Sequence, residues 1–197
     1  MLGLNHKGLF IPENFDKKLL NKIFVVLIGQ DLLIDNEKQN VALLDSDEIK
    51  WSGMDVVQEY FLGYLGDYSC YAAELSSDSS CMEGCSFKSF RSLLGLIPDN
   101  LFTICSRSVQ LTEWHNRNKY CGTCGSKTSL HPKERAMFCK KCENLFYPRI
   151  SPCVIVLVTK GKELLLARNR NFPSKLFSTL AGFIEPGETV EEAIKRE

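Results

Sequence analysis

The sequence has no apolar run of the roughly 18 to 20 residues that cross a bilayer, which excludes a membrane-spanning helix. Its start, MLGLNHKGLFIPENFDKK, lacks the charged-then-apolar order of a secretory signal. A hydrophobic content of 44% and a charged content of 24% are ordinary for a soluble globular protein. The expected location is therefore the cytoplasm, without a membrane partner.

The chain also has no net charge, but this average conceals an uneven distribution. Residues 1–116 hold 9 basic and 16 acidic side chains (−7), residues 117–175 hold 13 and 3 (+10), and residues 176–197 hold 2 and 5 (−3). A basic middle before an acidic end suits an anion held by cations on one side and by carboxylate-bound metal on the other. A basic stretch is equally consistent with a solvated surface, so the charge pattern alone does not decide between them.

Residues 1–116 have the pattern of one α+β unit. The expected elements are, in chain order, strands at 22–29, 31–35 and 40–45, a hairpin over 59–75 turning at Gly66-Asp67, a small-residue loop at 76–86 and a helical segment at 89–97. None of these segments carries an evident catalytic constellation.

A long helix is predicted over residues 98–120, with Asp99 or Asn100 as its N-cap. One face of this helix is apolar and contains Leu101, Ile104, Cys105, Val109, Leu111 and Trp114. His115 lies near its end and is expected to be a structural or surface residue rather than a ligand.

Nine cysteines, an odd number, favour metal ligands or buried thiols over disulfides in a reducing compartment. Four of them form two C-x2-C pairs fourteen residues apart, and these are Cys121, Cys124, Cys139 and Cys142. Each pair can turn both sulfurs toward one ion, and two pairs complete a tetrahedron around Zn²⁺. Because four thiolates close the coordination sphere, the predicted zinc is structural.

Two alternatives to this zinc ribbon remain. The cysteines could form a redox pair, although one C-x2-C would suffice for that chemistry. A ribbon in a basic stretch could also be a binding module for RNA or a partner protein. Cys81 and Cys85 have no second pair nearby, so no second metal site is predicted there.

The last fifty residues combine strands, a glycine turn and a helix. The expected elements are a buried strand at 151–160, a strand at 162–168, a polar loop at 169–175, a strand at 177–183, and a helix that begins at Thr189 with a capping box to Glu192.

The turn and helix carry Gly182, Glu188, Arg196 and Glu197 with the spacing G-x5-E-x7-R-E. This spacing resembles the first part of the Nudix box, whose family folds as an α/β/α sandwich and hydrolyses pyrophosphates. By this resemblance, the Gly182 carbonyl and Glu197 bind catalytic Mg²⁺ or Mn²⁺, and Glu188 and Arg196 form a bracing ion pair. A divalent metal would neutralise the phosphate charge and activate a water. Glycine turns before acidic helices are also common without any site.

The order of parts resembles one Nudix branch, the NADH pyrophosphatases, over roughly residues 90–197. This resemblance implies an N-terminal Nudix-like domain (1–116), a zinc ribbon (117–148) and a Nudix domain (149–197). It also implies hydrolysis of NAD(H) to AMP and nicotinamide mononucleotide, removal of NAD caps from RNA, and a homodimer. Tyr147 and Phe183 match positions that contact the nicotinamide part, although either aromatic could instead pack in a core.

Two family features are not found in the sequence. The family's dinucleotide-selecting motif follows the Nudix box, and two metal-binding glutamates follow the position of Glu197. The sequence therefore predicts an incomplete Nudix sandwich, a truncated form with little or no activity of its own. The alternative function is a zinc-ribbon binding module with an inert Nudix remnant.

Overall fold

The computed structural model describes residues 9–18, 20–170 and 175–197, and it has the predicted α+β class. The chain divides into two compact units, residues 1–148 and residues 149–197. Within the described residues, no helix is long and apolar enough to cross a membrane. Part of the loop expected at 169–175, residues 171–174, lies outside the described residues.

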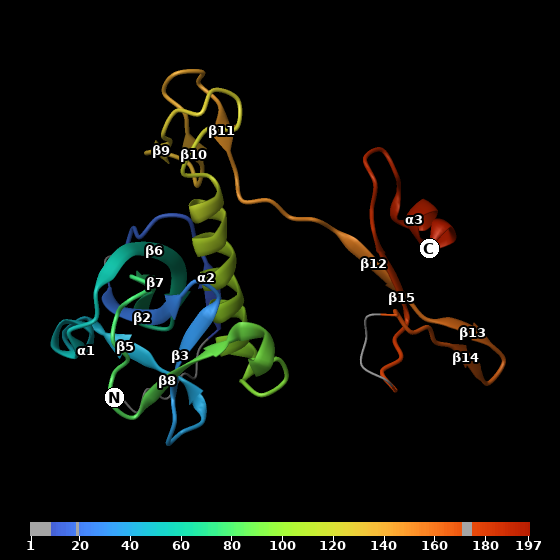
Figure 1. Cartoon of the computed structure of the whole chain (residues 1–197), viewed down its shortest axis with the longest axis horizontal. Helices are drawn as coiled ribbons and strands as arrows, with labels where there is room; N and C mark the ends of the chain where they lie inside the picture. Colours follow the sequence, from blue (N-terminus) through green and yellow to red (C-terminus); the bar gives the residue numbers. More distant parts are fainter. Residues whose placement is uncertain (1–8, 19, 171–174) are drawn as a thin grey trace. The chain divides into compact units, whose positions relative to one another are not determined.

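Unit 1 contains an eight-stranded mixed sheet and a long helix beside it (Figure 1). Its strands are β1 (Phe10–Pro12), β2 (Asn21–Ile28), β3 (Asp31–Asp35), β4 (Asn40–Val41), β5 (Leu43–Asp45), β6 (Val56–Leu65), β7 (Tyr68–Leu75) and β8 (Cys85–Ser89). The main strand order is β1-β6-β7-β2-β3-β4, while β5 pairs with β2 and β8 pairs with β3. Strands β2 and β7 run parallel, and the other pairs are antiparallel.

Gly63 allows β1 to lie close against β6. Its φ of +150° is rare for residues with side chains, and a Cβ at this position would collide with the Ile11 carbonyl oxygen. The register of β6 against β7 also shifts between Phe61 and Gly63. The sheet edge therefore depends on a residue without a side chain.

The predicted long helix is α2 (Asp99–Arg117), and it covers one face of the sheet. All six residues assigned to its apolar face are buried, which confirms that prediction. On the other face, a second core forms around Phe24, Leu44 and Met54, with partly buried Ile49 of α1 (Ser46–Ser52) packed against it.

Three N-terminal predictions were wrong in detail. The segment at 89–97 forms only a single short 3-10 helix, η1 (Phe90–Leu93), because Gly95 has a φ of +76°, which a continuing helix does not allow. Strand β8 takes the last residues of the loop expected at 76–86 and pairs them with β3. The N-cap of α2 is Pro98, not Asp99 or Asn100, because Asp99 already lies inside the helix and the Asn100 side chain accepts from the adjacent Leu101 amide.

The cysteine-rich segment packs onto the C-terminal end of α2 (Figure 1). It forms a three-stranded sheet of β9 (Ser129–Leu130), β10 (Met137–Phe138) and β11 (Leu145–Phe146). Met137 belongs to the same hydrophobic core as α2, and the Trp114 indole N–H donates to the Phe146 carbonyl oxygen at 3.1 Å. The guanidinium of Arg135 donates to Asn14 and to the carbonyl oxygens of Glu13 and Phe61.

Unit 2 consists of two strand pairs and one helix. Strand β12 (Cys153–Val156) pairs with β15 (Leu180–Phe183), β13 (Val158–Lys160) pairs with β14 (Glu163–Leu165), and α3 (Val190–Arg196) packs near β12. The single buried strand expected at 151–160 is wrong. It is divided between β12 and β13, and Ile155 and Val158 are exposed because the described residues of this unit provide no second layer over them.

Candidate functional site

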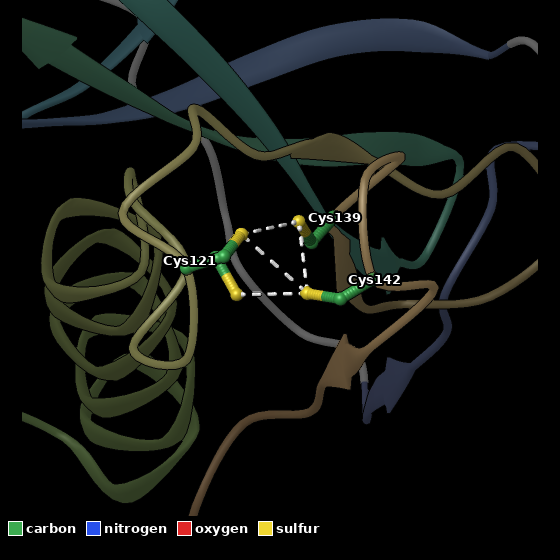
Figure 2. Close-up of side chains that lie close together, drawn as sticks. Cys121, Cys139 and Cys142 are labelled. Carbon is green, nitrogen blue, oxygen red and sulfur yellow. Dashed lines mark hydrogen bonds between the residues drawn. The ribbon is translucent and has the colours of Figure 1, made fainter.

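The four predicted zinc cysteines lie together in the β9–β11 segment. Their sulfurs all lie within 4.8 Å of one another, and those of Cys121 and Cys142 are 3.4 Å apart. A tetrahedron with Zn–S bonds of about 2.3 Å has edges of about 3.8 Å, close to this spacing. Figure 2 shows Cys121, Cys139 and Cys142 turned toward one another. Among the described residues, this is the one group of three or more potential ligands with metal-binding geometry.

The electrostatics of the cluster also fit a cation. Hydrogen bonds from Ser126 lower the pKa of Cys124 to about 6, so this thiol ionises near neutral pH. Hydrogen bonding to Cys121 and Cys139 raises the pKa of Cys142 to about 12, because crowded sulfurs resist a further negative charge. Four thiolates can coexist here only around a positive ion. The cluster therefore fits a structural zinc.

Local sequence explains why these cysteines converge. The amide of Gly125 donates to the Cys121 carbonyl oxygen at 2.8 Å and closes the first turn. Gly125 has a φ of +70°, which glycine adopts without strain. The Asn144 carbonyl oxygen accepts from the Cys139 amide at 2.9 Å and closes the second turn. None of the nine cysteines forms a disulfide in the structure.

His115 lies in the last turn of α2, away from any metal cluster of the described residues. Its Nδ1 is 2.7 Å from the Tyr60 hydroxyl, which donates to the buried carboxylate of Glu74 at 2.8 Å. Burial lowers the pKa of His115. The prediction of a structural histidine is confirmed.

The second candidate site lies at the turn between β15 and α3. Thr189 caps α3, and the predicted capping box with Glu192 is present. Because the helix begins at this point, Arg196 lies in its last turn and its side chain reaches the loop before the helix. Arg196 donates to both carboxylate oxygens of Glu188, at 2.8 and 2.9 Å. The ion pair expected between these two residues is present in the structure.

Arg196 also joins two further groups of the turn. It donates to the Phe183 carbonyl oxygen at 2.8 Å and to Glu197 Oε1 at 2.5 Å. Glu188 accepts in addition from the Glu185 amide at 2.9 Å. The Arg196 guanidinium lowers the pKa of Glu188 to about 2, so Glu188 stays ionised across the physiological range.

Glu197 lies directly against Gly182. A Cβ at Gly182 would overlap the Glu197 carboxylate, so the backbone at this point and that side chain occupy one small space. Gly182 lies in β15 opposite Val154, which is buried. The turn thus brings a backbone segment and a carboxylate together, and both offer the hard oxygen donors that Mg²⁺ and Mn²⁺ prefer.

The two predicted aromatic contacts belong to different units. Phe183 ends β15 with 64% of its surface exposed and lines a shallow hollow of about 360 Å³. Tyr147 follows β11, is 49% exposed, and donates its hydroxyl to Glu134. That hydrogen bond raises the pKa of Tyr147. Both rings therefore present exposed surface, and neither is buried in a core.

Three family models match consecutive parts of the chain. A rudimentary NUDIX domain of the NADH pyrophosphatase type matches residues 21–114, the NADH pyrophosphatase zinc ribbon matches residues 116–147, and the NUDIX domain matches residues 148–197. The chain belongs to the NADH pyrophosphatase family of Nudix proteins. The resemblance predicted from the sequence is confirmed, including the family's zinc ribbon.

Members of the NADH pyrophosphatase family with similar sequences carry the name NAD-capped RNA hydrolase NudC. The protein of Pseudomonas fluorescens strain Pf0-1 is 37% identical over 158 residues, covering 80% of this chain and 57% of the relative. The protein of Pseudomonas putida strain GB-1 is 37% identical over 182 residues, covering 92% and 64%. The chain thus spans 57% to 64% of the length of these two curated relatives.

The sequence did not predict the roles of two residues, one beside the candidate site and one that anchors the ribbon. Glu134 holds the Tyr147 hydroxyl, and Arg135 ties the ribbon to β6 and to the segment after β1. Glu134 is one of only two acidic residues between positions 117 and 148, a signal that could have identified it. Arg135 gave no such signal, because its acceptors are mostly backbone carbonyls more than seventy positions away.

Proposed function

We propose that this protein hydrolyses the pyrophosphate linkage of NAD(H) to AMP and nicotinamide mononucleotide, and that it also acts on NAD-capped RNA. The observation that carries the proposal is the turn in which Arg196 joins Glu188, Glu197 and the Phe183 carbonyl oxygen. Membership in the NADH pyrophosphatase family and the names of the relatives support the substrate class. A cytoplasmic location stays a prediction.

Glu197 and the Gly182 carbonyl are the proposed holders of Mg²⁺ or Mn²⁺. The fit rests on the space at Gly182, which admits the Glu197 carboxylate only because no side chain stands there. A divalent metal bound there would supply Lewis acidity and an activated water for attack on phosphorus. Arg196 would keep the Glu197 carboxylate in place beforehand, and Glu188 would keep Arg196 in place.

Tyr147 and Phe183 are the proposed contacts of the nicotinamide part. Each presents an exposed aromatic face, and stacking of a planar ring on such a face is favourable by about 0.5–1.5 kcal/mol beyond the burial of area. Glu134 fixes the hydroxyl end of Tyr147, so this ring would be oriented before substrate arrives. Such preorganisation reduces the entropy lost on binding.

We further propose that the 197-residue chain by itself has little or no hydrolytic activity. Within the described residues, Glu197 is the one carboxylate that lies against the backbone at Gly182. Mg²⁺ favours several oxygen ligands around it, and a pyrophosphate adds negative charge that a single carboxylate-held ion would neutralise poorly.

The proposal is tested with a chimaera in which this chain replaces the aligned part of the Pseudomonas fluorescens relative. AMP release from NADH with Mn²⁺ is measured for the chimaera, for the relative and for the 197-residue chain. We expect turnover by the chimaera and the relative, loss of at least 100-fold with Glu197→Gln, and no loss with the exposed control Glu191→Gln. Robust turnover by the 197-residue chain would refute its proposed inactivity, and a folded but inactive chimaera would refute the assigned site.

A second candidate function is RNA or partner binding by the ribbon. The ribbon segment and its approach present exposed cations together with Tyr120, which is 66% exposed; the cations are Lys119, Lys127, Lys133, Lys140 and Lys141. Binding that weakens steeply with added salt would support this function, and no binding at low salt would remove it.

Homodimerisation is a further proposal, taken from the resemblance to the family. Size-exclusion chromatography with light scattering is the test. A mass of about twice the 22.3 kDa chain is expected, and a monomer at micromolar concentration would contradict the proposal.

A further inference from the structure

The proposed function assigns only Phe183 among the residues that line the hollow beside it. The hollow lies where the segment before β12 meets the end of β15, and its lining residues are Ile150, Ser151, Pro152, Phe183, Ile184 and Glu185. The Ile184 amide donates to the Pro152 carbonyl oxygen at 3.0 Å, which joins the two segments that line the hollow. Its volume of about 360 Å³ is at the small end for ligand sites. A single planar ring system is therefore a better match than a whole dinucleotide.

The walls of this hollow differ in chemistry. Phe183 and Ile150 supply apolar surface and are 64% and 86% exposed. Glu185 and Ser151 supply polar groups. Glu185 is exposed, and the residues that the structure describes provide no partner for its carboxylate. An ionised carboxylate accepts hydrogen bonds and cannot donate them, so this wall favours a ligand with N–H groups.

We propose that Glu185 is a specificity-determining residue that accepts a hydrogen bond from the carboxamide N–H₂ of the nicotinamide ring stacked on Phe183. This proposal rests on the proposed function, because it takes the nicotinamide part as the occupant. The same carboxylate repels a ring that carries a carboxylate in place of the amide. Glu185 therefore selects amide over acid through one attractive and one repulsive contact.

The test compares two probes that differ only at this group, nicotinamide mononucleotide and nicotinic acid mononucleotide. Their binding to the 197-residue chain is measured by ligand-observed NMR titration at low ionic strength. We expect the amide to bind about fivefold more tightly, the ratio for two unit charges near 4 Å in water. Glu185→Gln should bring the ratio close to one, and the control Glu191→Gln should leave it unchanged. Phe183→Ala should weaken both probes.

Retention of the wild-type ratio by Glu185→Gln would overturn the proposal, and so would failure of the wild-type chain to bind either probe. Hydrolysis by the chimaera separates this result from the proposed function. Turnover of NADH with an unchanged ratio in Glu185→Gln rejects the role of Glu185 alone. If the chain binds the amide more tightly than the acid but the chimaera does not hydrolyse NADH, the hydrolytic function is rejected and the amide-selective site remains.

Discussion

Arg196 shows how one side chain can organise a loop that has little core beneath it. Its guanidinium satisfies Glu188, Glu197 and a backbone carbonyl oxygen with a planar set of donors. A lysine could not reproduce this arrangement, because its ammonium is a single point charge. The pair with Glu188 follows from the family spacing, whereas the bond to Phe183 depends on the three-dimensional path of the turn.

The ion pair gives a pH prediction for Glu188. Its folded-state pKa of about 2 lies below the ordinary value of 4.5, so its contribution to stability is present above about pH 4.5 and is lost as pH falls through 2. We expect the side-chain carboxyl carbon of Glu188 to titrate near pH 2 by NMR. Arg196→Gln should raise the midpoint toward the ordinary value, although the Glu185 amide still stabilises the carboxylate. A wild-type midpoint near 4.5 would contradict the pairing in solution.

Gly182 gives a second prediction. Gly182→Ala places a methyl group where the Glu197 carboxylate lies, so the carboxylate must move. A displacement of about 1 Å in a catalytic group can reduce turnover about 100-fold, and we expect a loss of that order in the chimaera. Ala181→Gly, on the neighbouring exposed residue, is the control. Unchanged turnover in Gly182→Ala would show that Glu197 does not act from this position.

At the scale of elements, the ribbon is held by contacts with α2 as well as by zinc. Strands β9 to β11 have only two residues each, too few to be stable by themselves. The buried side chain of Met137 and the bond from Trp114 to Phe146 join them to α2. Loss of the metal should therefore reach the N-terminal core.

Removal of the zinc is the corresponding prediction. We expect about one zinc per chain by metal analysis, and a lower melting temperature of unit 1 on chelation. Cys139→Ser should abolish zinc binding, because Cys139 is buried within the cluster. Cys81→Ser, at an exposed cysteine outside the cluster, is the matched control. A fully folded, zinc-free wild-type chain would refute the assignment.

Arg135 gives a prediction for the attachment of the ribbon to the N-terminal sheet. Arg135→Gln removes donors from the carbonyl oxygens of Glu13 and Phe61. We expect a loss of about 2 kcal/mol in the free energy of unfolding, the range for hydrogen bonds to charged groups. Urea denaturation measures it, with the exposed Lys133→Gln as control. Equal stability of the two variants would show that Arg135 is not an anchor.

For the molecule as a whole, the sequence predicted most of unit 1 because its periodic patterns coincide with packing. The apolar stripe of α2 and the Gly66-Asp67 hairpin are both present. Strand β8, in the segment expected as a loop, was missed because it pairs with β3, a partner about fifty positions away. Such long-range pairing leaves no local signal.

The candidate site was predictable where chemistry fixes spacing. The cysteine pairs and the positions of Gly182, Glu188, Arg196 and Glu197 come from short-range patterns. The hydrogen bond between Glu134 and Tyr147 and the hollow at Glu185 depend on the folded structure, and the one local signal for them is that Glu134 is a rare acidic residue in a basic segment. The sequence predicts a buried strand at 151–160 because its β-branched residues are typical of buried strands, but Ile155 and Val158 are exposed.

The two units should differ in their local stability. In unit 2, Val154 and Ala193 are the buried apolar residues within the described ranges, whereas β2 and β7 lie in the core of unit 1. We expect amides of β12 and β15 to exchange with solvent far faster than those of β2 and β7. Hydrogen exchange followed by mass spectrometry tests this, and equal protection would contradict it.

The chain contains only two tryptophans, and their surroundings make them opposite optical reporters. Trp51 is 84% exposed, while Trp114 is 7% exposed and hydrogen-bonded to the ribbon. Iodide should quench the emission of Trp51 and leave that of Trp114, which a dry environment shifts to shorter wavelength. If the ribbon undocked, the emission that iodide does not quench, that of Trp114, would shift to longer wavelength. Trp114 is therefore an intrinsic fluorescence probe of ribbon docking, and no attached dye is needed.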